Sequence, residues 1–226
     1  MRHVKGADMC FVAGCNISTP GGGRPIEHIR AGDLVDTVDG RVEQVLWAGL
    51  SRIPFAEQMI NTRKRPVRIG RGALGPQVPQ KAVLISPQHR VLVRSRQVLR
   101  MLGSAEAFVP ALSLTSLPGI RVMPPLPELE YLHLACARHS VLLVEGIGVE
   151  SILPEPSTLQ ELGSAERVSV SEQMEWTPYS LRPGDHARPV LSMRKAETLV
   201  QRCMRSRMPM YLPPGAPQPQ AREADV

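Results

Sequence analysis

Short apolar runs separated by turn residues fill the first two thirds of the chain. Most are bounded by Gly, Pro or Arg: Cys10–Ala13, Val67–Ile69, Ala82–Ile85, Val91–Val93, Ala107–Val109, Tyr131–Ala135 and Ser140–Val144. Runs of this length with turn signals close by are typical of strands. The turn residues Gly146-Ile147-Gly148 punctuate the chain after the last run. The pattern therefore predicts a compact all-β body.

Two tight connections are visible near the N-terminus. The first apolar run enters the turn Thr19-Pro20-Gly21-Gly22-Gly23. Further on, Leu34–Val38 and Val42–Trp47 flank Asp39-Gly40, a pair that strongly favours a β-hairpin.

The composition changes after Pro154, and the chain divides there. Residues 1–9 form a short polar leader and 10–154 the β body. The extension 155–208 is polar at first, and its apolar positions within 188–202 recur at helical spacing, which predicts one short helix. Residues 209–226 are rich in proline and are expected to form a disordered tail.

The net charge of +6 is concentrated between residues 52 and 100, where Glu57 is the one acid among eleven lysines and arginines. Such a stretch could neutralise phosphates. It could also be a solvated face, since Arg94 and Arg96 alternate as the outer row of a strand would. Aromatic residues are only 4%, and no helix-turn-helix or zinc-finger motif accompanies the charge. Nucleic acid is therefore the minor interpretation.

The four cysteines are scattered and include no CxxC pair, so no metal site, cofactor or disulfide framework is predicted from them. No apolar run approaches the roughly 18 residues that a membrane span needs, and Met1–Met9 lacks the character of a secretory signal. We expect no membrane association. The location stays open between the cytoplasm and export by a non-classical, type I-like route.

Four positions carry candidate chemistry: Cys10, the Ser86-Pro87-Gln88-His89 segment, His133 and His139. Taken singly, each has an ordinary structural explanation, because a lone cysteine is usually a small buried hydrophobe and a histidine in a strand is usually structural. A cysteine with distant histidines is a nucleophile with its base only if the fold brings them together.

The order and context of these segments resemble the Hint (Hedgehog/intein) domain, specifically the bacterial Hint-2 type. The opening block is Cys10-Phe11-Val12-Ala13-Gly14, continued by Thr19-Pro20-Gly21-Gly22 and Ile29-Arg30-Ala31-Gly32-Asp33-Leu34-Val35. Ile85–Arg90 is similar to the family's Thr-x-x-His block, with Ser86 in the hydroxyl position. Leu129–Ser151 resembles its two closing blocks run together.

The resemblance implies a horseshoe-like, pseudo-symmetric β fold that places the first and last strands side by side. It also implies an N-to-S acyl shift, in which the Cys10 sulfur attacks the carbonyl of Met9. His89 would then protonate the Cys10 nitrogen, Ser86 would hold the scissile peptide, and His133 would assist proton transfer. For His139, a role in the site and a structural role stay open.

Departures from the family pattern limit the expected reaction. An intein ends in His-Asn before a nucleophile, whereas the matching place here holds Glu150-Ser151 and the chain continues. The resemblance therefore implies thioester cleavage without full splicing. The substrate would be the chain's own N-terminal peptide, and water or a small nucleophile would resolve the thioester.

Two questions stay open at this point. Only Met1–Met9 precede the nucleophile, which fits a short cargo peptide, a remnant that lost its partner domain, or a misplaced start. Cys15, next to the opening block, is either a benign small residue or a competing thiol. The alternative function is a catalytically silent scaffold that meets an unknown protein partner through its basic stretch or its helix.

Overall fold

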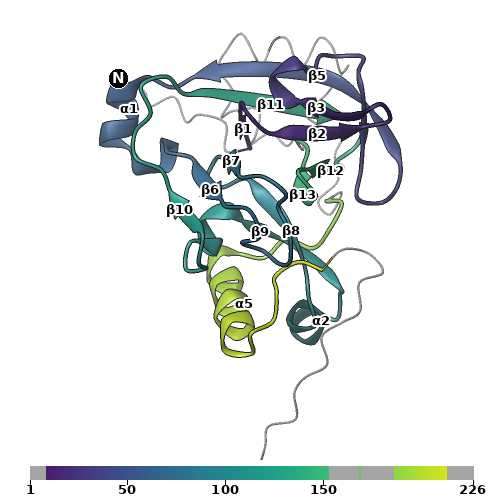
Figure 1. Cartoon of the computed structure of the whole chain (residues 1–226), viewed down its shortest axis with the longest axis vertical. Helices are drawn as coiled ribbons and strands as arrows, with labels where there is room; N and C mark the ends of the chain where they lie inside the picture. The colour runs from purple at the N-terminus through teal and green to yellow at the C-terminus, as the bar shows by residue number, and fades with distance from the viewer. Residues whose placement is uncertain (1–8, 153–167, 169–185, 213–226) are drawn as a thin grey trace, which may run out of the picture.

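The computed structural model describes residues 9–152, 168 and 186–212, and Figure 1 shows their arrangement. The strands are β1 (Phe11–Val12), β2 (Asn16–Thr19), β3 (Gly22–Pro25), β4 (Leu34–Asp36), β5 (Val42–Arg52), β6 (Val67–Ile69), β7 (Val83–Ile85), β8 (Arg90–Arg94), β9 (Glu106–Pro110), β10 (Ile120–Val122), β11 (Glu130–Cys136), β12 (Val141–Val144) and β13 (Ile147–Glu150). The α-helices are α1 (Phe55–Ile60), α2 (Arg96–Leu102) and α5 (Met193–Arg205). Short 3-10 turns cover Ile26–His28, Thr62–Lys64 and Ala111–Leu114.

Two antiparallel sheets bring the ends of the β body together. One sheet has the order β10-β6-β7-β1-β11-β5-β4, and the other has the order β3-β2-β12-β13-β8-β9. Strand β1 lies between β7 and β11, and β2 pairs with β12 through Ile17 and Val144. This confirms the expected fold class, in which the first strands lie beside the last. It also places Cys10, directly before β1, in the middle of a sheet.

The hairpin at Asp39-Gly40 is confirmed as the β4–β5 connection, with Gly40 in the left-handed region at φ +72°. Strand β5 is longer than the pattern predicted and continues to Arg52. It does so because β11 pairs with it as far as Glu130 opposite Arg52. The partner strand, which lies far away in the sequence, therefore sets the length of β5.

The connection between β12 and β13 corrects the predicted break at Gly146-Ile147-Gly148. The turn is Glu145-Gly146, with φ values of +47° and +84° that suit a two-residue hairpin. Ile147 and Gly148 already belong to β13. A Cβ atom on Gly148 would lie 2.8 Å from Val141 Cγ1 and 2.9 Å from Leu92 Cβ, so a close approach of neighbours requires glycine there.

Helices α1 and α2 interrupt the body and were not predicted. Helix α2 carries ordinary signals, because the Ser95 hydroxyl accepts the Val98 N–H at 3.3 Å and Gly103 ends the helix at φ +69°. Arg96 is the first residue of this helix. It is therefore not part of the outer row of a strand, as the alternation with Arg94 had predicted.

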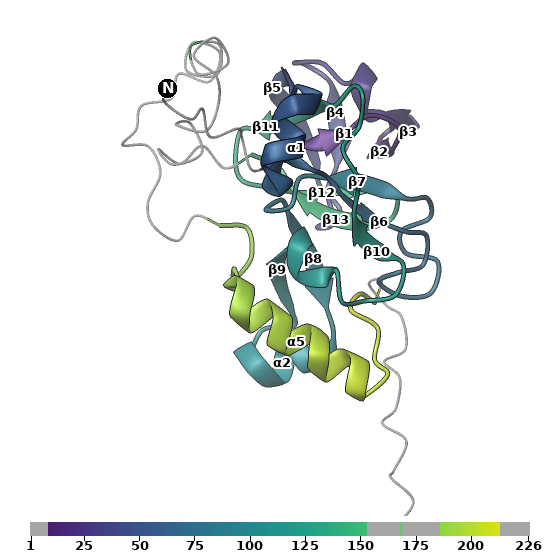
Figure 2. The same ribbon diagram turned by 90° about the vertical axis from the view of Figure 1, so that its left-hand side faces the viewer.

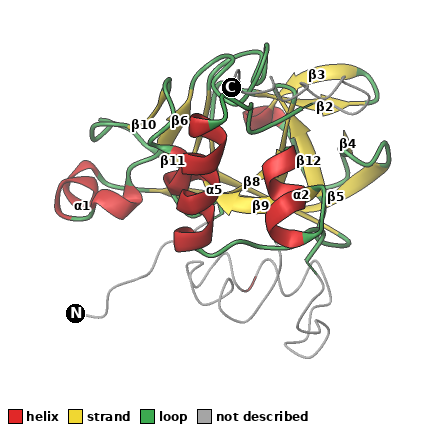
Figure 3. Cartoon of the chain, turned by 90° about the horizontal axis from the view of Figure 1, so that it is seen from below, coloured by secondary structure: helices red, strands yellow, loops and turns green. Residues whose placement is uncertain are grey.

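The helix predicted at 188–202 begins later than expected, since α5 covers Met193–Arg205. Before the helix, Val190 forms a parallel bridge with Phe108 of β9. The apolar side of α5 buries Ala196, Leu199, Val200 and Cys203. Figures 2 and 3 show α5 beside α2 at the end of the molecule formed by β8 and β9.

The prediction of a disordered tail from residue 209 is wrong for its first residues. The Tyr211 N–H donates to Leu74 O at 3.0 Å, and Arg94 N donates to Met210 O at 2.9 Å. Met210 and Tyr211 are both buried. The rest of the predicted tail, 213–226, lies outside the described residues, as do most of the leader and most of the extension up to 185.

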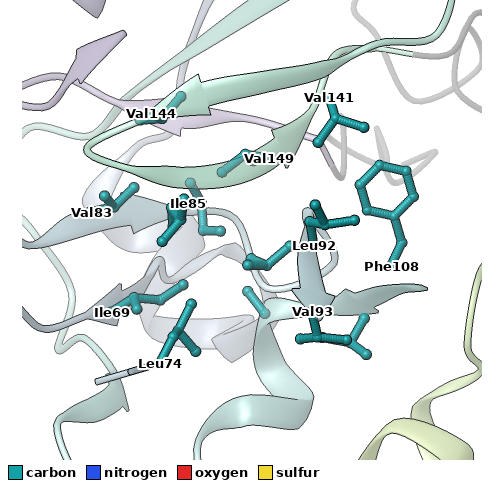
Figure 4. Close-up of a cluster of buried hydrophobic side chains, with 14 of the residues drawn as sticks. Ile69, Leu74, Val83, Ile85, Leu92, Val93, Phe108, Val141, Val144 and Val149 are labelled. Atoms are coloured by element: carbon teal, nitrogen blue, oxygen red, sulfur yellow. The ribbon is translucent and has the colours of Figure 1, made fainter. Parts of the chain in front are cut away.

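The main core lies between the sheets and is built almost entirely from aliphatic side chains. Figure 4 shows part of it, with Val83, Ile85, Leu92, Val144 and Val149 directed towards one another. These positions come from β7, β8, β12 and β13, so the core packing fixes β7, which is one of the two strands that flank the segment after Cys10. Among the described residues, no helix has the length and apolar character to cross a membrane.

Candidate functional site

Cys10 is buried where the chain enters β1, with 1% of its surface exposed. Its apolar neighbours are Ile53, Leu129 and Tyr131, which form a small cluster with it. Met9, on the other side of the predicted scissile bond, is also buried. The Met9–Cys10 peptide is therefore held inside the protein, where little solvent reaches it.

Ser86 lies directly after β7 and contacts the predicted scissile peptide. Its hydroxyl oxygen accepts the Cys10 N–H at 3.0 Å, and its own N–H donates to Cys10 O at 2.9 Å. The nitrogen of the Met9–Cys10 bond is thus fixed by one side-chain hydrogen bond. The pairing of β1 with β7 puts this contact in register, since Phe11 lies opposite Ile85.

His89 is buried against the same residue and lies edge-on to Phe11, with ring centroids 4.5 Å apart. Its Nδ1 is 2.9 Å from Cys10 O, and its Nε2 is 2.9 Å from Glu150 O. The ring therefore contacts the carbonyl oxygen of Cys10, whereas the predicted role requires it to protonate the Cys10 nitrogen. Burial lowers the pKa of His89, and the negative charge of Glu150 partly opposes that effect.

His133 approaches from β11, on the side of Met9. Its Nε2 lies 3.0 Å from the Ser51 hydroxyl. Burial lowers the pKa of His133 to about 4, the backbone of Met9 acts in the opposite direction, and the charge of His89 lowers the pKa further. A histidine with such a pKa is neutral at neutral pH, so its ring carries a free lone pair but holds an added proton only weakly.

His139 does not join Cys10. Its Nδ1 accepts the Ala187 N–H at 3.1 Å, which ties the described part of the extension to the β body. Its Nε2 lies 3.2 Å from Glu150 Oε2, an ion-pair distance without hydrogen-bond geometry. Of the two roles left open for His139, the structure provides contacts for the structural one.

Glu150 was absent from the predicted site residues, although its carboxylate is completely buried. It accepts the Arg90 N–H at 2.8 Å through Oε1 and contacts Arg90 Nη1 at 3.2 Å through Oε2. A glutamate that ends an otherwise apolar strand, Ile147–Glu150, was the available signal in the sequence.

Cys15 is buried, and two carboxylates act on its thiol. Burial raises the pKa of Cys15 to about 12, and the charges of Glu145 and Glu27 act in the same direction. A thiol with such a pKa is fully protonated at neutral pH and is a poor nucleophile.

Several residues of the basic stretch form ion pairs with glutamates of the same chain. Arg52 pairs with Glu130, Lys64 with Glu57, and Arg90 with Glu150. Their charges are therefore partly compensated. Within residues 9–152, 168 and 186–212, no group of three or more His, Cys, Asp or Glu side chains is arranged to hold a metal ion.

Comparison with known families gives one match over most of the described body. The model of the Hint domain, Hint_2, matches residues 9–156. Among solved structures, the bacterial intein-like domain from Clostridium thermocellum is 12% identical, with a TM-score of 0.41, over 64% of this chain and 99% of that chain. The AceL NrdHF class 3 split intein, in a splice-inactive variant, is 15% identical, with a TM-score of 0.43, over 65% and 99% of the two chains. No curated protein matches the sequence.

Proposed function

Because the chain belongs to the Hint domain family, we propose that it cleaves its own Met9–Cys10 bond through a Cys10 thioester. The observation that carries the proposal is the hydrogen bond from the Cys10 N–H to the Ser86 hydroxyl, at 3.0 Å. It engages the nitrogen that must leave, and the same Ser-x-x-His segment brings His89 to Cys10.

In the proposed step, the Cys10 sulfur attacks the carbonyl carbon of Met9 and its thiol proton passes to neutral His133. The Met9–Cys10 carbon–nitrogen bond then breaks, and His89 gives a proton to the departing nitrogen. The product is a thioester between the Met9 acyl group and the Cys10 sulfur, with a free amine on Cys10. An amide nitrogen leaves poorly without a proton, so the donor is essential to the reaction.

Water or a small thiol then attacks the thioester carbonyl and releases the segment upstream of Cys10. Full splicing is not part of the proposal, because Glu150-Ser151 stands where an intein has His-Asn. Cys15 does not take over the acyl group in this scheme, because its thiol stays protonated.

The test is intact mass spectrometry of the freshly purified chain, carrying a reporter peptide ahead of Met1, with and without added thiol. We expect a thiol-dependent loss of everything through Met9 in the wild type and no loss in Cys10→Ala. Cys136→Ala is a matched control, because Cys136 is also buried and lies outside the site. Identical intact masses for the wild type and Cys10→Ala under all thiol conditions would refute the proposal and favour a catalytically silent scaffold.

A further inference from the structure

The two ring nitrogens of His89 face two acceptors. Nδ1 is 2.9 Å from Cys10 O, and Nε2 is 2.9 Å from Glu150 O. A neutral imidazole carries one N–H, so it can donate to only one of these carbonyl oxygens. At the other ring nitrogen, the lone pair of the nitrogen then faces a lone pair of the carbonyl oxygen, which is unfavourable. Only the doubly protonated ring donates to both oxygens, and that form is the proton donor that the proposed cleavage requires.

A buried cation needs a compensating charge, and Glu150 is the acid that acts on His89. Its main-chain carbonyl contacts the ring, and its carboxylate is fully buried. Further titratable residues that contact or act on His89 are Cys10, whose carbonyl oxygen meets Nδ1, Arg90, whose charge disfavours a charged ring, and His133 on β11. Neither Arg90 nor His133 carries negative charge, so neither can replace Glu150.

The Glu150 carboxylate is itself held by Arg90, and His139 lies close to it. Arg90 donates to it through its backbone N–H and its guanidinium. His139 lies on the other side, with Nε2 3.2 Å from Oε2. The Ala187 N–H donates to His139 Nδ1, so His139 is bonded to the extension and reaches Glu150 only by proximity.

From these contacts we propose that Glu150 is a positioning residue for the cleavage reaction. Its main-chain carbonyl orients the His89 ring, and its buried carboxylate favours the protonated ring that donates the proton. Arg90 keeps that carboxylate in place through its backbone N–H and its guanidinium. The expected effect of Glu150 on the cleavage rate rests on the proposed function. The protonation of His89 can be measured without any cleavage.

The first measurement is the titration of His89, followed by nitrogen NMR of histidine-labelled full-length chain in a Cys10→Ala background. The chain has six histidines, and a His89→Gln sample assigns the signal. We expect Glu150→Gln to move the His89 midpoint to lower pH and Arg90→Gln to move it to higher pH. A purely structural role predicts no such opposite response, because both changes break the same Arg90–Glu150 pair.

Glu43→Gln is the matched control, since Glu43 is also buried and pairs with Arg138 at 3.0 Å, away from His89. It should leave the titration unchanged. The proposal is overturned if Glu150→Gln titrates as the wild type does, or if Glu150→Gln and Arg90→Gln move the midpoint in the same direction. If Glu150→Gln does not fold, Arg90→Gln alone decides. A His89 midpoint that is unchanged or lower in Arg90→Gln would then overturn the proposal.

The second measurement is the rate of thiol-induced release at neutral pH in chains that retain Cys10. Glu150→Gln should slow release by about tenfold, because an opposite charge at short range ordinarily changes proton affinity by at least that factor. Glu43→Gln should not slow it. If the wild type releases nothing, the proposed function fails, while the titration in the Cys10→Ala background still decides whether Glu150 controls His89.

Discussion

Replacing Ser86 by alanine removes the hydroxyl that accepts the Cys10 N–H at 3.0 Å while leaving the neighbouring backbone pairing in place. Ser86 and Cys10 are 3% and 1% exposed, so water has little access to a donor that loses this acceptor. A buried donor without a partner costs about 1–3 kcal/mol. For a chain of this size, that corresponds to a loss of roughly 2–12 °C in Tm.

The same change should slow the proposed cleavage. If the hydrogen bond orients the departing nitrogen, losing it slows release by about tenfold to a hundredfold. The assay is thiol-dependent release of an N-terminal reporter, followed by intact mass, with thermal unfolding monitored by circular dichroism on the same samples. Ser86→Thr keeps the hydroxyl and should recover most of the release.

Ser113→Ala is the control for the loss of a buried hydroxyl. Ser113 is also buried, and it donates to Pro110 O at 2.6 Å, away from Cys10. We expect a change in Tm without a change in release rate. Wild-type values of both Tm and release rate in Ser86→Ala would refute the reasoning, as would a folded Ser86→Thr that releases no faster than Ser86→Ala.

Three further predictions concern stability and the second thiol. The pKa of His133 falls from 6.5 to about 4 on folding, so its contribution to stability is complete above pH 6.5 and is lost as the pH falls towards 4. The loss amounts to about 3 kcal/mol of the free energy of unfolding. In urea unfolding at several pH values, this free energy should therefore depend less steeply on pH in His133→Gln than in the wild type. Gly148→Ala should lower stability by about 1–3 kcal/mol, because the new Cβ meets Leu92 Cβ at 2.9 Å, and an unchanged urea midpoint would contradict the close approach. Cys15→Ala should leave the rate of thiol-induced release unchanged, since the thiol stays protonated at neutral pH, and a slower release would show that Cys15 takes part.

Local patterns were sufficient for much of the β body. The apolar runs at Val67–Ile69 and Ala107–Val109 lie within strands β6 and β9, and the Asp39-Gly40 turn is where the sequence puts it. These features depend on alternation and turn residues within a few positions, which are properties of the chain itself. Helix α2 also has local signals, the capping residues Ser95 and Gly103, which a prediction from apolar runs alone does not use.

The sequence by itself determined which residues are chemically able to act, and the resemblance placed Cys10, Ser86 and His89 among them. Only the tertiary structure decided which of these meet. It joined Ser86 to Cys10 across 76 residues and turned His89 towards the Cys10 carbonyl. It also directed His139 to Ala187 and brought Glu150 to His89. Contacts of this kind depend on strand register and burial over long sequence separations, which no local pattern encodes.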